Sequence, residues 1–136
     1  MSAPLVRIRE EVVPAVSTAG NDDDTVLGQA PFAGSVAKVE YVPEAAITGA
    51  ATNNRTLSLI NKGQAGSGTT VVASLNFGNG TNATASNEVT LTLSATASDL
   101  VVAEGDTLVW RSLHIGTGIT DPGGLARVTF SRATSS

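Results

Sequence analysis

Short segments in which apolar and polar residues alternate recur along this chain, and this period of two constrains its fold more than any other feature. The clearest example is Val71, Ala73, Leu75 and Phe77, whose side chains would share one face. Alternation of this kind is typical of a strand with one buried and one solvated face. Six segments show it, at residues 36–41, 57–61, 71–77, 89–93, 108–112 and 128–130. Such a succession of short strands predicts an all-β fold, an antiparallel β-sandwich of jelly-roll-like form.

The sequence between these segments supplies the turns that such a fold needs. Glycine with Asn, Asp, Ser or Pro stands at residues 66–68, 78–80, 104–106 and 121–124. Glycine tolerates positive φ, and Asn and Asp side chains hydrogen-bond to the nearby backbone. Only residues 43–49 and 95–100 are candidates for a short helical turn. We expect the aromatic side chain of Trp110 to belong to the core.

The first thirty residues have a different pattern. Apolar side chains are interspersed with Arg and Glu up to residue 13, and a small, polar and acidic stretch follows that includes Asp22, Asp23 and Asp24. We interpret residues 1–13 as an extended N-terminal arm, residues 14–30 as its mobile linker, and residues 31–136 as the sandwich domain. An isolated strand cannot bury its apolar side chains, so we expect the arm to contact a partner through Leu5, Val6, Ile8, Val12 and Val13. The alternative is that these residues form an ordinary first strand of the same sandwich.

Composition argues against several classes of function. The 136 residues suffice for one domain with a core, and the net charge is −4 with eight dispersed Lys and Arg residues. Nucleic acid is therefore not an expected partner. No apolar run approaches the ~20 residues that cross a bilayer, and the N-terminus lacks a signal-peptide pattern, so we expect synthesis in the cytoplasm and no membrane contact. The absence of cysteine removes disulfides and thiolate chemistry.

Candidate catalytic and metal-binding residues are few. His114 is the only histidine, and no Gly-x-Ser-x-Gly nucleophile motif accompanies it. Asp22, Asp23 and Asp24 offer oxygen ligands for Ca²⁺, but they lack the spacing and terminal Glu of an EF-hand and are better read as a solvated linker. The glycines at residues 63–68 precede neither a Lys-Ser/Thr pair nor a helix. We therefore expect no enzymatic activity, no metal and no cofactor, and instead binding through a broad surface.

Residues 31–130 resemble a family of small capsid decoration, or cement, proteins encoded beside the major capsid gene in phages of actinobacteria. The resemblance rests on turn and strand motifs rather than on active-site signatures. They are Phe32-Ala33-Gly34-Ser35-Val36-Ala37-Lys38-Val39-Glu40-Tyr41-Val42-Pro43-Glu44-Ala45, Ile47-Thr48-Gly49-Ala50, Asn54-Arg55-Thr56-Leu57, Asn61-Lys62-Gly63, Glu104-Gly105-Asp106-Thr107-Leu108, Gly116-Thr117-Gly118 and Asp121-Pro122-Gly123-Gly124.

The resemblance implies a β-sandwich that forms a homotrimer on the outer surface of a phage head and bridges subunits of the major capsid protein. It also implies that an N-terminal arm makes part of the contact, and it brings no catalytic residues with it. A different function stays open, namely a carbohydrate- or receptor-binding sandwich module of a tail fibre. Sugar binding normally uses exposed aromatic rings, and beyond three Phe residues this chain has only Tyr41 and Trp110.

Overall fold

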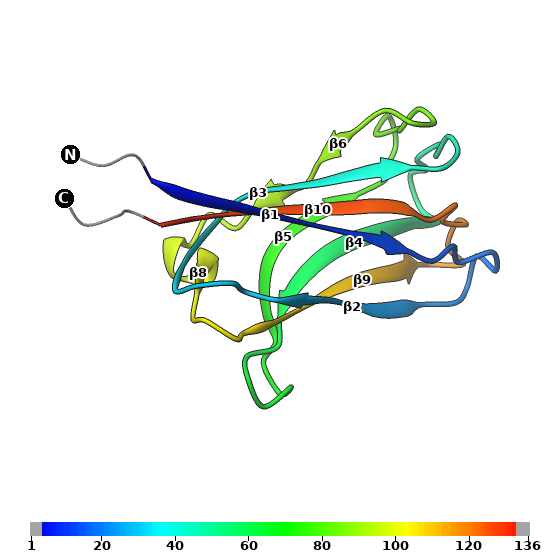
Figure 1. Ribbon diagram of the computed structural model, residues 1–136. Helices are drawn as coiled ribbons and strands as arrows, with labels where there is room; N and C mark the ends of the chain where they lie inside the picture. The colour runs from blue at the N-terminus through cyan, green and yellow to red at the C-terminus, as the bar shows by residue number, and fades with distance from the viewer. Residues whose placement is uncertain (1–3, 133–136) are drawn as a thin grey trace.

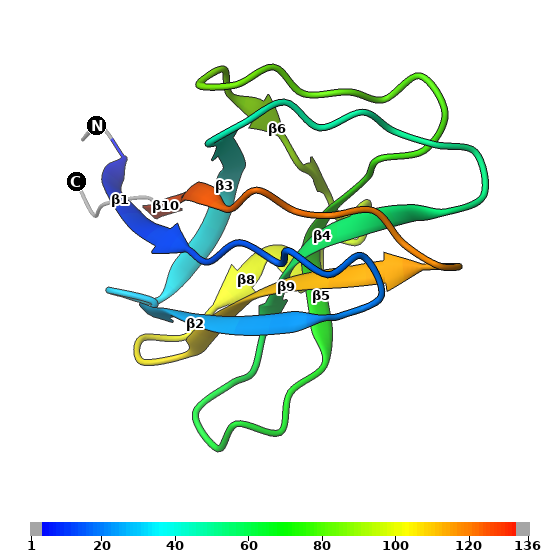
Figure 2. The same cartoon turned by 90° about the vertical axis from the view of Figure 1, so that its right-hand side faces the viewer.

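The computed structural model describes residues 4–132 as two antiparallel five-stranded sheets packed face to face (Figures 1 and 2). The first sheet has the order β1-β10-β3-β6, with the short β8 also paired to β3, and the second has the order β2-β9-β4-β5-β7. The strands are β1 (Leu5–Val13), β2 (Asp23–Gln29), β3 (Gly34–Pro43), β4 (Asn54–Asn61), β5 (Thr70–Asn76), β6 (Val89–Thr90), β7 (Thr92–Leu93), β8 (Val101–Val102), β9 (Thr107–Ile115) and β10 (Gly124–Arg132). The predicted all-β antiparallel sandwich is confirmed.

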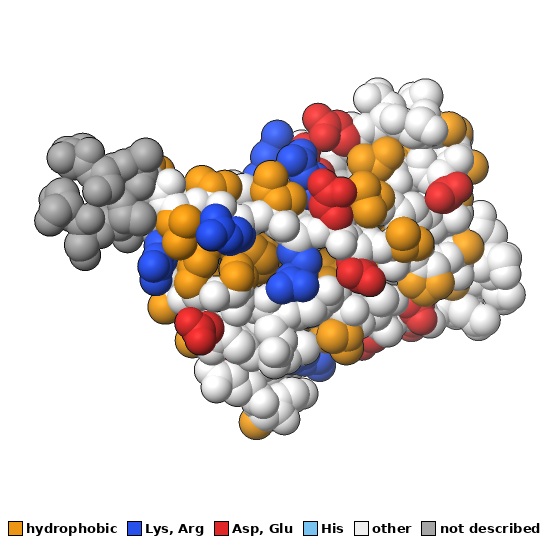
Figure 3. All heavy atoms as spheres, in the orientation of Figure 1, with side chains coloured by type: hydrophobic (Ala, Val, Ile, Leu, Met, Phe, Trp, Pro, Cys, Tyr) orange, Lys and Arg blue, Asp and Glu red, His pale blue; other side chains and the backbone are white. Residues whose placement is uncertain are grey.

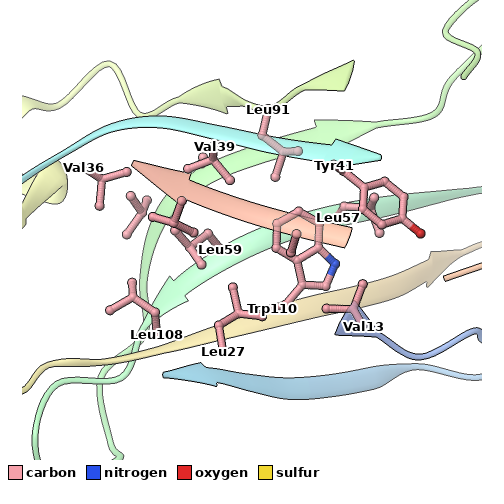
Figure 4. Close-up of a cluster of buried hydrophobic side chains, with 14 of the residues drawn as sticks. Val13, Leu27, Val36, Val39, Tyr41, Leu57, Leu59, Leu91, Leu108 and Trp110 are labelled. Carbon is pink, nitrogen blue, oxygen red and sulfur yellow. The ribbon is translucent and has the colours of Figure 1, made fainter. Parts of the chain in front are cut away.

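The core lies between the two sheets and consists of the inward halves of the alternating segments (Figure 4). Trp110 of β9 and Tyr41 of β3 come from opposite sheets, and their ring centroids lie 5.6 Å apart. The prediction that Trp110 belongs to the core is confirmed. Full burial of a Val, Leu or Phe side chain contributes about 1.5–3 kcal/mol. Other members of the core are Val36, Val39, Leu57, Leu59, Val72, Phe77, Leu91, Leu108, Val128 and Phe130.

The segment at residues 89–93 passes from one sheet to the other. β6 pairs with β3 of the first sheet, and β7 pairs with β5 of the second. Leu91 lies between these two short strands, is buried, and donates its backbone N–H to the carbonyl of Val39 at 2.9 Å. A strand that changes sheets at a corner is a normal device of β-sandwiches. The predicted single strand is thus two short ones.

The two candidate helical turns have different outcomes. Residues 97–100 form the short 3₁₀ helix η1 (Ala97–Leu100), as expected. The candidate at residues 43–49 is wrong, because Ile47 forms a β-bridge with Ala83 through backbone hydrogen bonds of 2.9 and 2.8 Å. The Ile47 side chain is buried, so tertiary contacts determine the backbone conformation there.

The first thirty residues differ from the expected arm and linker. β1 pairs with β10 along its whole length, from Leu5 opposite Arg132 to Val13 opposite Gly124. This is the alternative interpretation, a first strand of the same sandwich. Residues 23–29 of the expected linker form β2, which pairs with β9 and buries Leu27. Because Leu27 is the only buried residue of β2, the sequence of this strand shows no alternation of apolar and polar residues. Residues 1–3 of the predicted arm lie outside the described residues.

Candidate functional site

β1 is an edge strand, and three of its apolar side chains are exposed on the face that points away from the core. Arg7, Arg9 and Glu11 stand opposite Phe130, Val128 and Ala126 of β10, which are core residues. Directly opposed residues of an antiparallel pair share a face, so these three charged positions of β1 are on the core side. The alternate positions, Val6, Ile8, Glu10 and Val12, therefore occupy the outer face of the first sheet.

The five predicted contact residues divide into two groups. Val6, Ile8 and Val12 lie on the outer face and are 45%, 47% and 73% exposed. Val13 is buried in the core, and Leu5 packs partly against it. Three of the five residues therefore form an exposed apolar row, which we call the β1 outer row, and the other two hold the strand on the sandwich.

Charged side chains on the core side of β1 are tolerated because the strand lies at the sandwich margin, beside the edge strand β2. The aliphatic part of Arg9 lies over Gly28, where an added Cβ would stand 2.8 Å from Arg9 Cδ. Gly28 has φ +141 and coincides with a register shift in the β2–β9 pairing. This bulge leaves room for the Arg9 side chain. In Figure 1, β1 lies in front of the other strands.

A row of ion pairs crosses the outer face of the first sheet beside the β1 outer row. Arg127 of β10 lies 3.3 Å from Glu10 of β1 and 3.4 Å from Glu40 of β3, and Lys38 lies 3.4 Å from Glu40. A hydrogen bond from the Glu88 carboxyl lowers the pKa of Glu40, and the positive charges of Lys38 and Arg127 lower it further. The same contact with Glu40 raises the pKa of Glu88. Figure 3 shows hydrophobic, basic and acidic side chains interspersed on this side of the molecule. The surface is mixed, as protein-binding surfaces commonly are.

Two of the three acidic residues at the start of β2, Asp22 and Asp24, form hydrogen bonds with residues of β9. Asp22 accepts hydrogen bonds from the backbone N–H of His114 at 2.8 Å and pairs with its ring Nδ1 at 2.6 Å, and the backbone bond is the main reason that the pKa of Asp22 is lowered. Arg111 donates two hydrogen bonds to Asp24, at 2.9 and 3.1 Å, which lowers the pKa of that carboxyl. A shallow hollow here is lined by Asp22, Asp23, Asp24, Arg111 and Leu113. Residues 4–132 contain no group of three or more His, Cys, Asp or Glu placed to hold a metal ion.

A buried polar network joins the two sheets, and sequence reasoning missed it. Asp121, expected only as a turn residue, accepts hydrogen bonds from Tyr41 Oη and Ser112 Oγ, both at 2.7 Å, and from the backbone N–H of Gly123 at 3.0 Å. Arg55 donates to Ser112 Oγ at 3.1 Å. Its other donors reach the carbonyls of Ile119, Ala19 and Asn21 at 2.8–3.0 Å. Every member of the network is bonded within the fold, so its role is structural.

All five aromatic side chains of the chain are buried: Phe32, Tyr41, Phe77, Trp110 and Phe130. A sugar-binding surface would need at least one exposed ring on which a sugar could stack. No helix in the described part of the chain is long and apolar enough to cross a membrane.

Comparison with known proteins gives one distant structural likeness. A scan against family models finds no match, and a comparison with curated proteins finds none either. Among solved structures, the fold is similar to a chain in "Structure of infectious bursal disease virus Gx strain", with 10% sequence identity and a TM-score of 0.43. The match covers 96% of this chain and 32% of that one, so the chain spans about a third of the viral protein. A likeness this distant carries no argument about function.

Proposed function

We propose that this protein is a non-enzymatic capsid decoration protein, which binds the outer surface of a phage head and stabilises the shell by bridging major capsid protein subunits. The observation that carries the proposal is the β1 outer row, three aliphatic side chains exposed on an edge strand. The family resemblance of residues 31–130 supplies the identity of the partner. The protein would be made in the host cytoplasm and would reside on the outside of the virion.

Binding to the capsid would cover the β1 outer row. Burying apolar surface stabilises a contact by roughly 25 cal/mol per Å². Val6, Ile8 and Val12 project from one strand at intervals that a protein surface could cover together. The neighbouring ion pair of Glu10 with Arg127, whose side chains are both partly exposed, would form the polar part of such an interface.

The alternative function, a carbohydrate- or receptor-binding module of a tail fibre, has less support. Its sugar-binding form normally uses an exposed aromatic side chain, and all five are buried. A glycan array probed with the purified protein would favour this alternative if it showed saturable binding to a sugar. The homotrimer that the resemblance implies stays a prediction, and the mass of the wild-type oligomer in solution decides between it and a dimer.

Substitutions test this proposal better than removal of residues 1–13, because β1 is paired along its length and its deletion would expose β10. The test variant is Val6→Ser/Ile8→Ser/Val12→Ser. A matched control is Val26→Ser/Val71→Ser/Val101→Ser, which changes valines that are 63%, 44% and 58% exposed on β2, β5 and β8. Each is mixed with expanded, undecorated heads assembled from the major capsid protein of the same phage, and bound protein is quantified after sedimentation.

The proposal predicts saturable, stoichiometric binding of the wild type and the control, and at least a tenfold weaker affinity of the test variant. Absence of wild-type binding would contradict the decoration function. Equal binding of all three proteins would contradict the assignment of the contact to the β1 outer row.

A further inference from the structure

The backbone edge of β1 is a second feature of this strand, distinct from its outer row. β1 is the last strand of the first sheet, and within residues 4–132 no strand pairs with its other edge. It is nine residues long and contains no proline, so its free edge presents a row of N–H and C=O groups, of which the Val6 carbonyl accepts a hydrogen bond from Arg7 Nη1 at 3.0 Å. Such an edge is a template for a strand from another chain.

The order of charges along β1 indicates which strand fits there. The basic residues Arg7 and Arg9 come first and the acidic residues Glu10 and Glu11 follow. A strand of the same sequence that runs antiparallel would bring the acidic half of one copy beside the basic half of the other. A uniformly basic or uniformly acidic strand would place like charges together instead, which is destabilising. The edge is therefore self-complementary.

We infer that two copies of this chain associate by antiparallel pairing of β1 with β1, which joins their first sheets into one continuous sheet across a two-fold axis. The inference goes beyond the proposed capsid binding and does not depend on it. Because the contact is isologous, it closes with two copies and leaves neither β1 edge free.

The two-fold symmetry of the β1–β1 pair restricts the register in which the two strands can align. Directly opposed residues point to the same face, so outer-face residues must meet outer-face residues and the axis must pass through a residue. Centring on Arg9 sets Arg7 opposite Glu11 but places two Arg9 guanidinium groups together on the axis. Centring on Glu10 sets Arg9 opposite Glu11 and Ile8 opposite Val12. The Glu10 carboxylates then meet on the axis, and each already has Arg127 as a counter-ion at 3.3 Å. We therefore assign the register centred on Glu10.

Because the chain has no cysteine, single cysteines report this register cleanly. Glu10→Cys stands opposite its own copy, at a Cβ separation near that of a disulfide, and should cross-link rapidly under mild oxidation. Ile8→Cys alone or Val12→Cys alone would lie about 13 Å from its own copy and should not. A mixture of the Ile8→Cys and Val12→Cys proteins should cross-link between the two variants. Arg9→Cys is the control, because it should cross-link rapidly with its own copy only if the pairing is centred on Arg9.

Charge exchange provides the second test. Sedimentation of the wild type should give twice the 13.7 kDa chain mass at micromolar concentration. Arg9→Glu and Glu11→Arg should each weaken dimerisation at least tenfold, and the double variant Arg9→Glu/Glu11→Arg should restore it. Rescue by exchange distinguishes a pairing between copies from a loss of fold in either single variant.

Three results would overturn the inference. The first is a wild-type protein that stays monomeric up to millimolar concentration. The second is a trimer or any other oligomer that forms without Glu10→Cys cross-linking. The third is a dimer whose affinity is indifferent to both charge reversals. Capsid binding could survive each of these results, and failure of capsid binding would leave the dimer measurements unchanged.

Discussion

Tyr41 of the first sheet donates its phenolic hydrogen to Asp121 Oδ1 at 2.7 Å, in a site from which solvent is excluded. Ser112 of the second sheet donates to the other oxygen of the same carboxylate. Asp121 also forms a backbone bridge with Val16, in the connection between β1 and β2. Asp121 thus joins both sheets through its carboxylate and, through its backbone, fixes the connection that leads from β1 into the second sheet.

Tyr41→Phe should lower the free energy of unfolding by about 1.5–3 kcal/mol, because a buried charged acceptor loses a donor while the ring remains. Urea denaturation followed by the fluorescence of Trp110, the single tryptophan, measures this. A loss below about 0.5 kcal/mol would show that the Asp121 carboxylate does not depend on Tyr41.

Alkaline titration should show Tyr41 unionised in the folded protein. Burial, and secondarily the Asp121 carboxylate, raises the pKa of Tyr41 above its ordinary value of 10.0. A raised folded pKa means that this contribution to stability is complete below pH 10 and is lost as pH rises further. Since Tyr41 is the only tyrosine, absorbance at 295 nm reports it alone. We expect ionisation to coincide with unfolding, and ionisation near pH 10 with the fold intact would contradict this.

Arg55→Met should destabilise the fold by about 3–5 kcal/mol, since it removes the donors for three backbone carbonyls and the cation in a buried polar network. Arg111→Met is the matched control, because its pair with Asp24 is largely exposed and should contribute less than about 1 kcal/mol. Urea midpoints of the two variants make the comparison. Equal losses would refute the structural role of Arg55.

Acid stability should depend on Asp106. The backbone N–H of Ala103, followed by the side chains of Asn61 and Gln64, lowers the pKa of Asp106 below its ordinary value of 3.8. A lowered folded pKa contributes stability that is present above pH 3.8 and is lost as pH falls through the folded value. Asp106→Asn should therefore flatten the decline in the thermal midpoint between about pH 4 and pH 2. An unchanged decline would place the acid sensitivity elsewhere.

The sequence allowed prediction of those elements whose side chains have a simple period. Ala73 and Leu75 follow the predicted alternation because β5 has a core face, and Trp110 is buried as predicted. Val71 does not follow it: its side chain is 44% exposed and Val72 is buried instead, at a register shift in the β4–β5 pairing. β2 was not predicted because only Leu27 of this strand reaches the core. Asp24 of β2 and the preceding Asp22 pair with Arg111 and His114, which are distant in sequence. The change of sheets at Leu91 and the Asp121 network depend on tertiary neighbours that a local pattern does not encode.

The sequence predicts five apolar contact residues in β1, and the structure exposes three of them. Alternation identified apolar residues in the segment Leu5–Val13 but could not show which face of the strand they occupy. Val13 and Leu5 pack against the core, whereas Val6, Ile8 and Val12 face outward. The pairing register with β10 decides between these outcomes, and a strand's partner is not visible in its own sequence.

The most direct test of the decoration function is an electron-microscopy reconstruction of expanded, undecorated heads incubated with the purified protein. We predict added density on the outside of the shell. The outer face of β1 and β10 should lie against the major capsid protein, with Val6, Ile8 and Val12 within the contact. Heads without added density, or a bound protein whose β1 outer row faces solvent, would contradict it.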